Sequence, residues 1–418
     1  TLHQCKCQID GCRFQSPLAI TWEQRKVTEI GKIYIGLVTT MTKHYTDEGT
    51  LLIRNSDIKD GKFEFGDNPI YLEKTFAEKN ETRMHQIGDV ITVHTGDVGT
   101  SAVITENEAK SIGFATIVTR PNPKIIDSNY LCSFLNTDKH KKWAVSISTG
   151  DGRTNYNLGD YFELVVPVPS IAEQKKIASY IQKLNRLITL HQRKYDKLVM
   201  SKKSMLEKMF PKNGQTKPEI RFSGFIDDWE QRKLGDVAEF SKGSGYSKGD
   251  LVEYGTPIIL YGRLYTNYET RISDVDTFVE AKVGSVYSKG GEVIVPASGE
   301  TAEDIARAAT VDKSGILLGG DLNIVMPNKD INSSFLAISI SSGNPQRELA
   351  KKAQGKSVVH IHNEEIKNLV LPFPIKDEQN KIASYFCQLD NLITLHQREF
   401  AFLCKEKSKK FRYIKNAW

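Results

Sequence analysis

EQKKIASYIQKLNRLITLHQR, residues 173–193, decides the fold of this chain, because it returns near the C-terminus as EQNKIASYFCQLDNLITLHQR, residues 378–398. The two copies are offset by 205 residues without a gap, and most of their positions are identical. Such identity is far beyond chance, so the stretch is an internal repeat, and a repeat governs the architecture of the whole chain.

Apolar residues in each copy recur with the alternating spacing of three and four that is typical of a coiled-coil seam. Neither copy contains proline or glycine, and Pro211 ends the first. Two matched helices in one chain are expected to pair, and one long surface helix occurring twice is the alternative. Polar residues on the seam are expected to set its register rather than to bind a ligand. These are His191, His396, Lys202 and Lys407, whereas the apolar seam consists of Ile177, Ile181, Leu184, Ile188, Leu198, Ile382, Phe386, Leu389, Ile393 and Leu403.

At 418 residues the chain is too long for one hydrophobic core, so two or more domains are expected. Its 39% hydrophobic and 26% charged residues are typical of a soluble globular protein. No apolar run approaches the length of a membrane span, and no signal peptide is visible. We therefore expect a cytoplasmic protein with no membrane partner.

Three of the six cysteines crowd the start of the chain, where Cys5, Cys7 and Cys12 follow His3. Zinc binding is one interpretation of this cluster. However, the single residue between the first two cysteines is a shorter gap than zinc sites use, and no second pair follows. We therefore expect no metal and a loosely ordered, reduced leader over residues 1–19.

Positive charge is concentrated in the repeated helices. Residues 171–213 have a net charge of +8 and residues 375–418 of +4, so the rest of the chain is net −6 within a total of +6. A nucleic-acid binder with basic globular domains would show the opposite distribution. Any DNA contact of the globular parts must come from local patches, with the helices or a partner supplying the general attraction to phosphates.

The repeat extends beyond the helices. TWEQRK at 21–26 returns as DWEQRK at 228–233, and LVVPVP at 164–169 returns as LVLPFP at 369–374. The chain thus reads as a globular module, a proline-marked exit and a long helix, followed by the same again. The predicted segments are a leader at 1–19, module one at 20–168, helix one at 169–213, a linker at 214–227, module two at 228–373 and helix two at 374–418.

Both modules are predicted to be α+β, because short β-rich runs alternate with Gly, Asp and Asn turns around one helical stretch. In module one we expect strands at 90–93, 117–119 and 162–166, and helix around 129–147. In module two we expect strands near 291–296 and 324–326, and helix near 333–354. Between the shared landmarks the modules diverge almost completely, which indicates one scaffold that holds two loop sets for two targets.

No catalytic motif is supported by its context. AKKAQGKS at 350–357 fits a loose P-loop pattern, but a helical run precedes it and a strand-like run follows, which is the reverse of the required order. NPIY at 68–71 is similar to a motif of adenine methyltransferases but lacks its second proline and a glycine-rich cofactor loop. EAK at 280–282 matches the end of a nuclease motif, a tripeptide common in lysine-rich proteins. We therefore predict a non-catalytic chain.

Two variable modules that alternate with two near-identical helices resemble the specificity subunits of Type I restriction–modification systems. The resemblance is carried by DDWEQRKLGDV at 227–237, by the PxPxxxEQxKIA exits at 167–178 and 372–383, and by LITLHQR in both helices. It covers the chain from Trp22 onward. The sequence departs from the family at its ends, in the cysteine-bearing leader, in KVTEIG at the start of module one and in the FRYIKNAW tail.

The resemblance implies an α+β fold with two target-recognition domains in a pseudo-two-fold repeat, separated by two helices that form an antiparallel coiled coil. Each domain would read one half of a bipartite, asymmetric double-stranded DNA target. The helices would set the spacing and dock two methyltransferase subunits, and restriction subunits would join later. The chain itself is expected to hold no cofactor, since S-adenosylmethionine belongs to the methyltransferase partner, which methylates adenine, and ATP and magnesium belong to the restriction partner.

Two such modules match successive turns of one duplex, on which phosphate contacts set the register and side chains at base edges read the sequence. The candidate readers are polar, Arg-containing or Gly-flanked loops that differ between the modules, and a solvated turn is the alternative for each. In module one they are Arg54, Asn55, His94, Thr95, Arg153, Asn155 and Tyr156. In module two they are Lys242, Tyr246, Lys248, Tyr261, Arg263, Ser298, Lys356 and His360.

Two other functions stay open at this point. The sequence gives neither the recognised bases nor the spacer length, because no code relates such loops to nucleotides, so a coiled-coil scaffold whose modules bind protein is one alternative. A self-contained nuclease or methyltransferase is the other. Retention of specific DNA at moderate salt distinguishes a DNA reader from a scaffold, and activity of the purified chain alone would indicate an enzyme.

Overall fold

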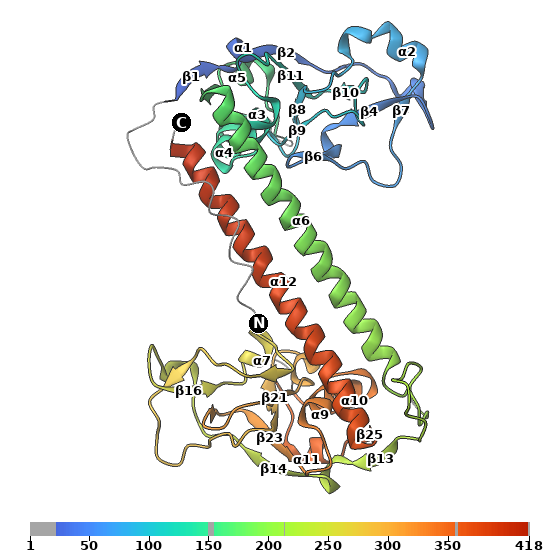
Figure 1. Ribbon diagram of the computed structural model, residues 1–418, viewed down its shortest axis with the longest axis vertical. Coiled ribbons are helices and arrows are strands. Elements are labelled where there is room, and N and C mark those ends of the chain that lie inside the picture. Colours follow the sequence, from blue (N-terminus) through green and yellow to red (C-terminus); the bar gives the residue numbers. More distant parts are fainter. Residues whose placement is uncertain (1–21, 149–153, 213, 356–357, 417–418) are drawn as a thin grey trace. The chain divides into compact units, whose positions relative to one another are not determined.

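The computed structural model describes residues 22–148, 154–212, 214–355 and 358–416, with the backbone alone over 410–416. It comprises two compact units, unit 1 with residues up to Thr189 and from Ala401 onward, and unit 2 with residues 190–400. The division cuts both long helices, α6 (Ile171–Lys208) and α12 (Lys376–Asn416), which are labelled in Figure 1. The segment limits drawn from the repeat landmarks stay a prediction, and the leader lies outside the described residues.

Unit 1 contains three small sheets and a hairpin. The first sheet pairs β1 (Glu23–Lys26) with β12 (Val165–Val168), in antiparallel fashion. The second, also antiparallel, has the order β2 (Gly31–Ile35), β11 (Ile117–Pro121), β8 (Val90–Thr92) and β9 (Ser101–Val103). The third has the order β10 (Ile112–Phe114), β4 (Thr50–Arg54), β7 (Tyr71–Leu72) and β3 (Tyr45–Thr46), and its β10–β4 pair is parallel. The hairpin is β5 (Ile58–Lys59) and β6 (Lys62–Phe63).

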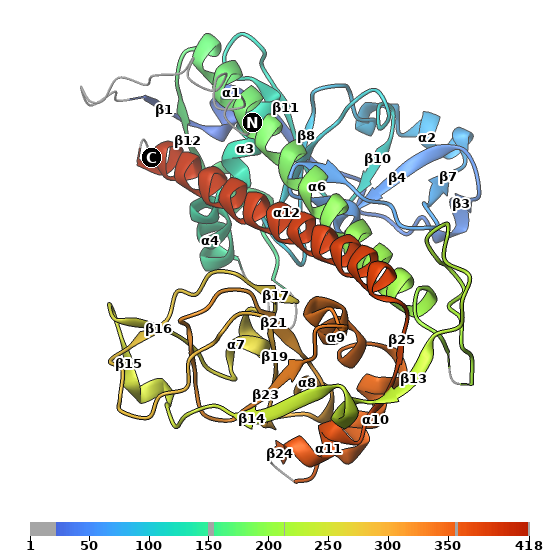
Figure 2. The ribbon, with the colours of Figure 1, turned by 60° about the horizontal axis from the view of Figure 1, so that its bottom comes forward.

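Unit 2 repeats the three sheets with strands at equivalent places in the chain. The first pairs β13 (Glu230–Lys233) with β25 (Val370–Phe373). The second has the order β14 (Ala238–Lys242), β23 (Leu322–Pro327), β19 (Glu292–Pro296), β21 (Ala309–Val311) and β17 (Arg271–Ile272), seen side by side in Figure 2. The third has the order β22 (Leu317–Leu318), β16 (Thr256–Ile259), β18 (Phe278–Val279) and β15 (Leu251–Val252), again with one parallel pair, β16–β22. Unit 2 adds the pair β20 (Ser298–Gly299) and β24 (Val359–His360).

Short helices accompany the sheets in each unit, and those after the second sheet are also repeat-equivalent. Unit 1 contains α1 (Val27–Ile30), α2 (Lys74–Lys79), α3 (Ser128–Leu135), α4 (Asp138–Ile147) and α5 (Leu158–Phe162), and the 3₁₀ helices η1 (Thr42–His44), η2 (Asn55–Asp57) and η3 (Glu81–Arg83). Unit 2 contains α7 (Arg263–Thr266), α8 (Ala302–Ile305), α9 (Ser333–Ile340), α10 (Gly343–Lys352) and α11 (Asn363–Lys367), and the 3₁₀ helices η4 (Leu234–Asp236) and η5 (Lys248–Asp250).

The α+β fold class and the doubled architecture predicted from the repeat are confirmed. Each predicted helical stretch is two helices, α3 and α4 in unit 1 and α9 and α10 in unit 2. In unit 1, Thr137 accepts a hydrogen bond from the backbone nitrogen of His140 and so begins α4. The strand predicted at 162–166 is wrong in its first half. Residues up to Phe162 form α5, whose Tyr161 is fully buried, and the strand begins only at Val165, where the apolar run starts.

The EQ pair at the start of each long helix contains a glutamine, Gln174 or Gln379, whose contacts explain why both copies of the repeat have it. Gln174 is fully buried near the start of α6, where it accepts a hydrogen bond from the backbone nitrogen of Asp127 (2.8 Å) and donates one to the carbonyl of Pro169 (2.8 Å). Gln379 makes the same bond to Asn332 (2.8 Å) in unit 2. Asp127 and Asn332 cap α3 and α9, so one amide side chain joins the start of the long helix to the module.

The apolar seam has two roles. Its first residues bury against their own module, since Ile177 and Ile181 belong to the core of unit 1, and Ile382 and Phe386 belong to the core of unit 2. Leu184, Leu389 and Leu403 are also buried, Leu198 packs against the unit 2 core, and Ile188 and Ile393 are half-buried.

The polar seam residues show how the helices pair within unit 2. His191 contacts His396, whereas Lys202, further along α6, forms an ion pair with Asp390, which comes earlier on α12. The residue further along α6 therefore contacts a residue earlier on α12, so the two segments are antiparallel. The equivalent lysine in unit 1, Lys407, bonds to Asp60 of the module (3.1 Å).

Candidate nucleic-acid interface

Three loops predicted as readers in module one meet in unit 1. The backbone nitrogen of His94 donates a hydrogen bond to Oδ1 of Asn55 (2.8 Å), and Nδ1 of His94 lies 2.7 Å from Oγ1 of Thr95. That hydroxyl donates to Oδ1 of Asn155 (2.9 Å), and Thr95 and Asn155 also form a β-bridge. The ends of β4 and β8 and the segment after residue 153 thus share one polar cluster, which we call cluster 1 (Asn55, His94, Thr95 and Asn155).

The hydrogen bonds of cluster 1 determine which ring nitrogen of His94 carries the proton. Burial lowers the pKa of this imidazole, so the ring is neutral at pH 7. Because Thr95 uses its single proton on Asn155, the bond between His94 and Thr95 must take its proton from Nδ1. Nε2 of His94 is then a hydrogen-bond acceptor. An acceptor suits the exocyclic amino groups that adenine and cytosine present in the major groove.

Arg54, next to Asn55 of cluster 1, forms an ion pair within its own loop. Its guanidinium holds the buried carboxylate of Asp57 through Nε (3.0 Å) and Nη2 (2.8 Å), and its own backbone nitrogen bonds to the same carboxylate (2.8 Å). The carboxylate raises the pKa of Arg54. The Nε/Nη2 edge of the guanidinium is thus used within the loop, while the side chain is 35% exposed, so the DNA contact of Arg54 stays a prediction.

Tyr156 is also misassigned by the sequence. Its side chain is fully buried, with ring centroids 5.4 Å from Tyr161 and 6.0 Å from His140, and burial raises the pKa of its hydroxyl. Its backbone nitrogen donates to the carbonyl of His94 (2.8 Å). The polar residues around Tyr156 led us to predict a solvated loop. The ring is buried instead, because burying the large apolar area of an aromatic side chain is favourable.

A second cluster, in unit 2, occupies the equivalent place in the repeat. Ser298 and His360 are opposite one another in the β20–β24 pair, and Oγ of Ser298 lies 3.2 Å from Nδ1 of His360. The hydroxyl of Tyr265 donates to the carbonyl of Ser298, and the ring of Tyr261 packs edge-on against Tyr265 at 6.0 Å. We call Tyr261, Ser298 and His360 cluster 2. His360 is exposed and Tyr261 is 36% exposed, whereas Ser298 is 7% exposed.

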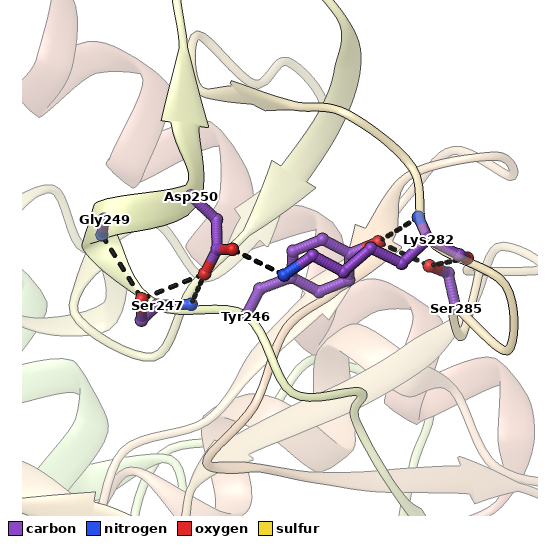
Figure 3. Close-up of polar contacts among 6 residues, drawn as sticks. All are labelled: Tyr246, Ser247, Gly249, Asp250, Lys282 and Ser285. Atoms are coloured by element: carbon purple, nitrogen blue, oxygen red, sulfur yellow. Dashed lines mark hydrogen bonds and ion pairs between the residues drawn. The ribbon is translucent and has the colours of Figure 1, made fainter.

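Tyr246 is an anchor, which corrects its prediction as a reader. Figure 3 shows its hydroxyl accepting the backbone N–H of Lys282 (2.7 Å) and bonding to Ser285 (2.5 Å). Nζ of Lys282 lies 4.8 Å from the centre of the tyrosine ring and pairs with Asp250. Tyr246 is only 7% exposed. Its neighbours Lys242, at the end of β14, and Lys248, at the start of η5, are both exposed.

Arg263 is likewise committed inside the module. Its guanidinium bonds to the carboxylates of Glu269 (2.9 Å) and Asp276 (3.0 Å) and to the carbonyl of Asp274 (2.9 Å), and its side chain is 11% exposed. Two carboxylates neutralise its charge, so the prediction that it contacts DNA is corrected. The remaining predicted readers, Arg153 and Lys356, lie outside the described residues.

Sequence reasoning missed the residues that support these loops. Lys282 was considered only as part of a nuclease tripeptide, yet it pins the loop to Asp250 and Tyr246. Tyr265 was not considered. One signal was present in SKGD at 247–250, a capping box in which Ser247 and Asp250 bond each other's backbone and fix η5.

The described residues contain no cluster of three or more His, Cys, Asp and Glu side chains able to hold a metal ion. Within the same residues, no helix is both long and apolar enough to cross a membrane. Of the P-loop-like stretch, 350–352 end helix α10, which is the context expected from the sequence.

Comparisons with known proteins place both repeats in one family. The family model of the Type I restriction modification DNA specificity domain matches residues 19–200 and again 226–401. The specificity subunit of the Type I restriction enzyme MjaVIII of Methanocaldococcus jannaschii is 24% identical over 298 residues, which cover 68% of this chain and 69% of that protein. The putative MjaX specificity subunit of the same organism is 24% identical over 416 residues, covering 93% and 91%.

A solved structure has the same fold. The crystal structure of the S subunit of a Type I restriction–modification system from M. genitalium aligns with a TM-score of 0.58 and 13% identity, over 96% of this chain and 97% of that one. Because the family model covers most of the chain and matches both repeats, the chain belongs to the Type I restriction–modification DNA specificity family and is a specificity subunit.

Proposed function

We propose that the two modules of this specificity subunit each read one half of a bipartite double-stranded DNA target, through cluster 1 and cluster 2. One observation carries this proposal. The two clusters lie at equivalent places in the repeat, after β4 and β16, after β8 and β19, and at Asn155 and His360, yet they share no residue. A common scaffold with unlike polar side chains at one corner is what two different half-sites require.

The side chains suit base edges. Cluster 1 offers the acceptor Nε2 of His94 beside the amide of Asn155, and amide side chains pair with adenine through two hydrogen bonds. Cluster 2 offers the imidazole of His360 with the hydroxyl and ring of Tyr261. The exposed Lys242 and Lys248 supply phosphate contacts, which set position without reading sequence.

The helices dock the partners. Leu190, Leu392 and Leu395 in unit 2 are 45%, 44% and 51% exposed although they belong to the repeated LITLHQR motif. Exposed leucines on a helix are expected to be covered by a partner. We propose that they bind the two methyltransferase subunits, which use S-adenosylmethionine to methylate adenine, and that restriction subunits with ATP and magnesium complete the complex. The chain itself then needs no cofactor.

The test of DNA reading is methylation in cells. The chain is co-expressed with its methyltransferase subunit in a host without adenine methylation, and modified adenines are mapped by long-read sequencing. The intact chain should give one bipartite motif. Asn155→Ala should relax only one half-site and His360→Ala only the other, by about tenfold each, since one good base contact contributes about 1–3 kcal/mol of discrimination.

The control is His44→Ala, which removes a partly exposed histidine that bonds Glu73 and belongs to neither cluster. It should leave the motif unchanged. Equal relaxation of both halves by either cluster variant would refute the assignment. A soluble complex that methylates no adenine and does not retain DNA would favour the alternative function, a scaffold whose modules bind protein.

Docking has its own test. Leu395→Asp should abolish co-purification of the methyltransferase, because a carboxylate cannot be buried in an apolar contact without a large desolvation cost. Ile226→Asp is the matched control, since Ile226 is a 77% exposed apolar residue that is not on either helix. Normal co-purification of the Leu395 variant would argue against this surface.

A further inference from the structure

The seam of the helix pair contains two histidines at equivalent positions of the repeat, His191 on α6 and His396 on α12, both within unit 2. Their Nδ1 atoms face each other at 3.0 Å, and their ring centroids are 5.1 Å apart with an interplanar angle of 61°. Because equivalent residues of two antiparallel helices meet here, the local two-fold axis of the pair passes between the rings.

The hydrogen bond between the two rings makes the equivalent histidines chemically unlike. One Nδ1 must carry a proton and the other must accept it, so equivalent residues are forced into different tautomers.

The spacing of the two nitrogens fits a shared metal ion. An ion about 2.0–2.1 Å from each Nδ1 would, across 3.0 Å, have an N–metal–N angle of about 94°. This angle is close to that between neighbouring ligands in square-planar or octahedral sites and well below the tetrahedral angle that zinc prefers. Imidazole ligands in tetragonal geometry select Cu²⁺ or Ni²⁺.

We propose that His191 and His396 form a two-histidine site for a divalent transition-metal ion, with Ni²⁺ and Cu²⁺ favoured over Zn²⁺. Both rings adopt the same tautomer on binding, with the proton on Nε2 and Nδ1 on the metal, so no net proton is released. Water completes the coordination, and Glu399, one turn after His396, is the nearest carboxylate on α12. The ion would bond α6 to α12 and hold their register, independently of what the modules read.

The experiment is calorimetric titration of the full-length chain with Ni²⁺ at pH 7.5. Ni²⁺ is the probe because Cu²⁺ is reduced by thiols, and Cys132, Cys387 and Cys404 are free. Loss of an outer-shell partner already weakens metal sites by about 10–100-fold, so loss of a ligand in His191→Gln or His396→Gln should weaken one site by at least tenfold. His44→Gln is the matched control and should bind like the intact chain. Any contribution of the leader, residues 1–19, is common to every variant and does not affect the difference.

A second measurement avoids substitution. Carbethoxylation of histidines in the intact chain, read by mass spectrometry, should be slowed by Ni²⁺ at His191 and His396 and not at His360. Equal Ni²⁺ binding by the intact chain and both seam variants would overturn the proposal, and so would equal labelling of the two histidines with and without Ni²⁺. Tighter binding of Zn²⁺ than of Ni²⁺ at this site would overturn its geometric part.

Discussion

Units 1 and 2 share their sheet orders and helix starts, but they treat buried polar groups and empty space differently. Unit 1 buries two histidines, His85 and His140, whereas unit 2 buries an ion pair between Arg221 and Glu378. Beside the long helix, unit 2 has a cavity of about 690 Å³ lined in part by Cys387, and unit 1 has one of about 40 Å³ because the β5–β6 hairpin fills the equivalent place. The repeat thus conserves backbone pairing and leaves charge and loops free to vary.

The ion pair of unit 2 provides the largest expected difference. Glu378 is fully buried and accepts two bonds of 2.7 Å from Nε and Nη2 of Arg221, which lies in the segment predicted as a linker. Arg221→Ala leaves the carboxylate buried without a partner and should lower the free energy of unfolding by about 3–5 kcal/mol. Urea unfolding followed by circular dichroism measures this change.

The repeat supplies the control for that prediction. Glu173 is the equivalent of Glu378, but it is only half-buried and forms no ion pair with the described residues. Glu173→Gln should therefore change stability by less than about 1 kcal/mol. Similar losses for Arg221→Ala and Glu173→Gln would mean that the difference between the two helix starts has no energetic weight.

The buried histidines of unit 1 predict a stronger pH dependence in that unit than in unit 2. Burial lowers the pKa of His140 to about 4, and its Nδ1 donates to the carbonyl of Leu135 (2.6 Å). Since the folded pKa is depressed, the folded state resists protonation, so stability falls as the pH drops from about 6.5 towards 4 and is unaffected above that window. The loss amounts to about 3 kcal/mol for this residue.

His140→Leu should remove that part of the acid sensitivity, and the difference between its unfolding free energies at pH 7 and pH 4 should shrink by about 3 kcal/mol. His44→Leu, at a partly exposed site, should not change it. Hydrogen exchange at pH 5 locates the effect, since peptides of unit 1 should exchange faster in the intact chain while those of unit 2 do not. Equal acid sensitivity of both units would contradict the assignment.

Most of the fold follows from the sequence because the repeat and its periodicity are local signals. Strands such as β8 and β19 are short runs rich in Val and Ile, and both long helices show the seam spacing. The seam pattern does not reveal what covers it. Ile177 and Ile382 lie on the predicted seam yet pack on their own modules, because periodicity reports which face is buried and not the partner that buries it.

The site was less predictable, because residues of the same chain compete with a ligand for the hydrogen-bonding groups of the candidate side chains. Arg263 and Tyr246 were chosen as readers because of their chemistry, but nearby carboxylates or backbone groups already use that chemistry. Such partners come from other strands and cannot be placed without the fold. The structure brings two of the candidate loops together, since Thr95 bonds Asn155, and Gly and Asn turns mark where such loops begin.

The smallest expected difference concerns the seam lysines. Lys202 in unit 2 pairs with Asp390 on the other helix, whose second oxygen accepts a bond from Thr270 (2.6 Å). Lys407 in unit 1 pairs with Asp60, a 43% exposed residue of the β5–β6 hairpin. Asp390→Asn should cost about 1–2 kcal/mol, since it weakens a half-buried network, and Asp60→Asn about 0.5 kcal/mol or less.

The equivalent of Asp390 in unit 1 is Asn185, which borders the same small cavity as Asp60. If the carboxylate that pairs with Lys407 can come from either the helix or the hairpin, Asn185→Asp alone should hardly change stability. The same substitution should restore stability in the Asp60→Asn background. A double-mutant cycle on urea midpoints measures the coupling, which should favour the pair by a few tenths of a kcal/mol or more. Strict additivity would show that Lys407 pairs only with the hairpin carboxylate. The carboxylate that pairs with the seam lysine could then not be moved from the hairpin to the helix in unit 1.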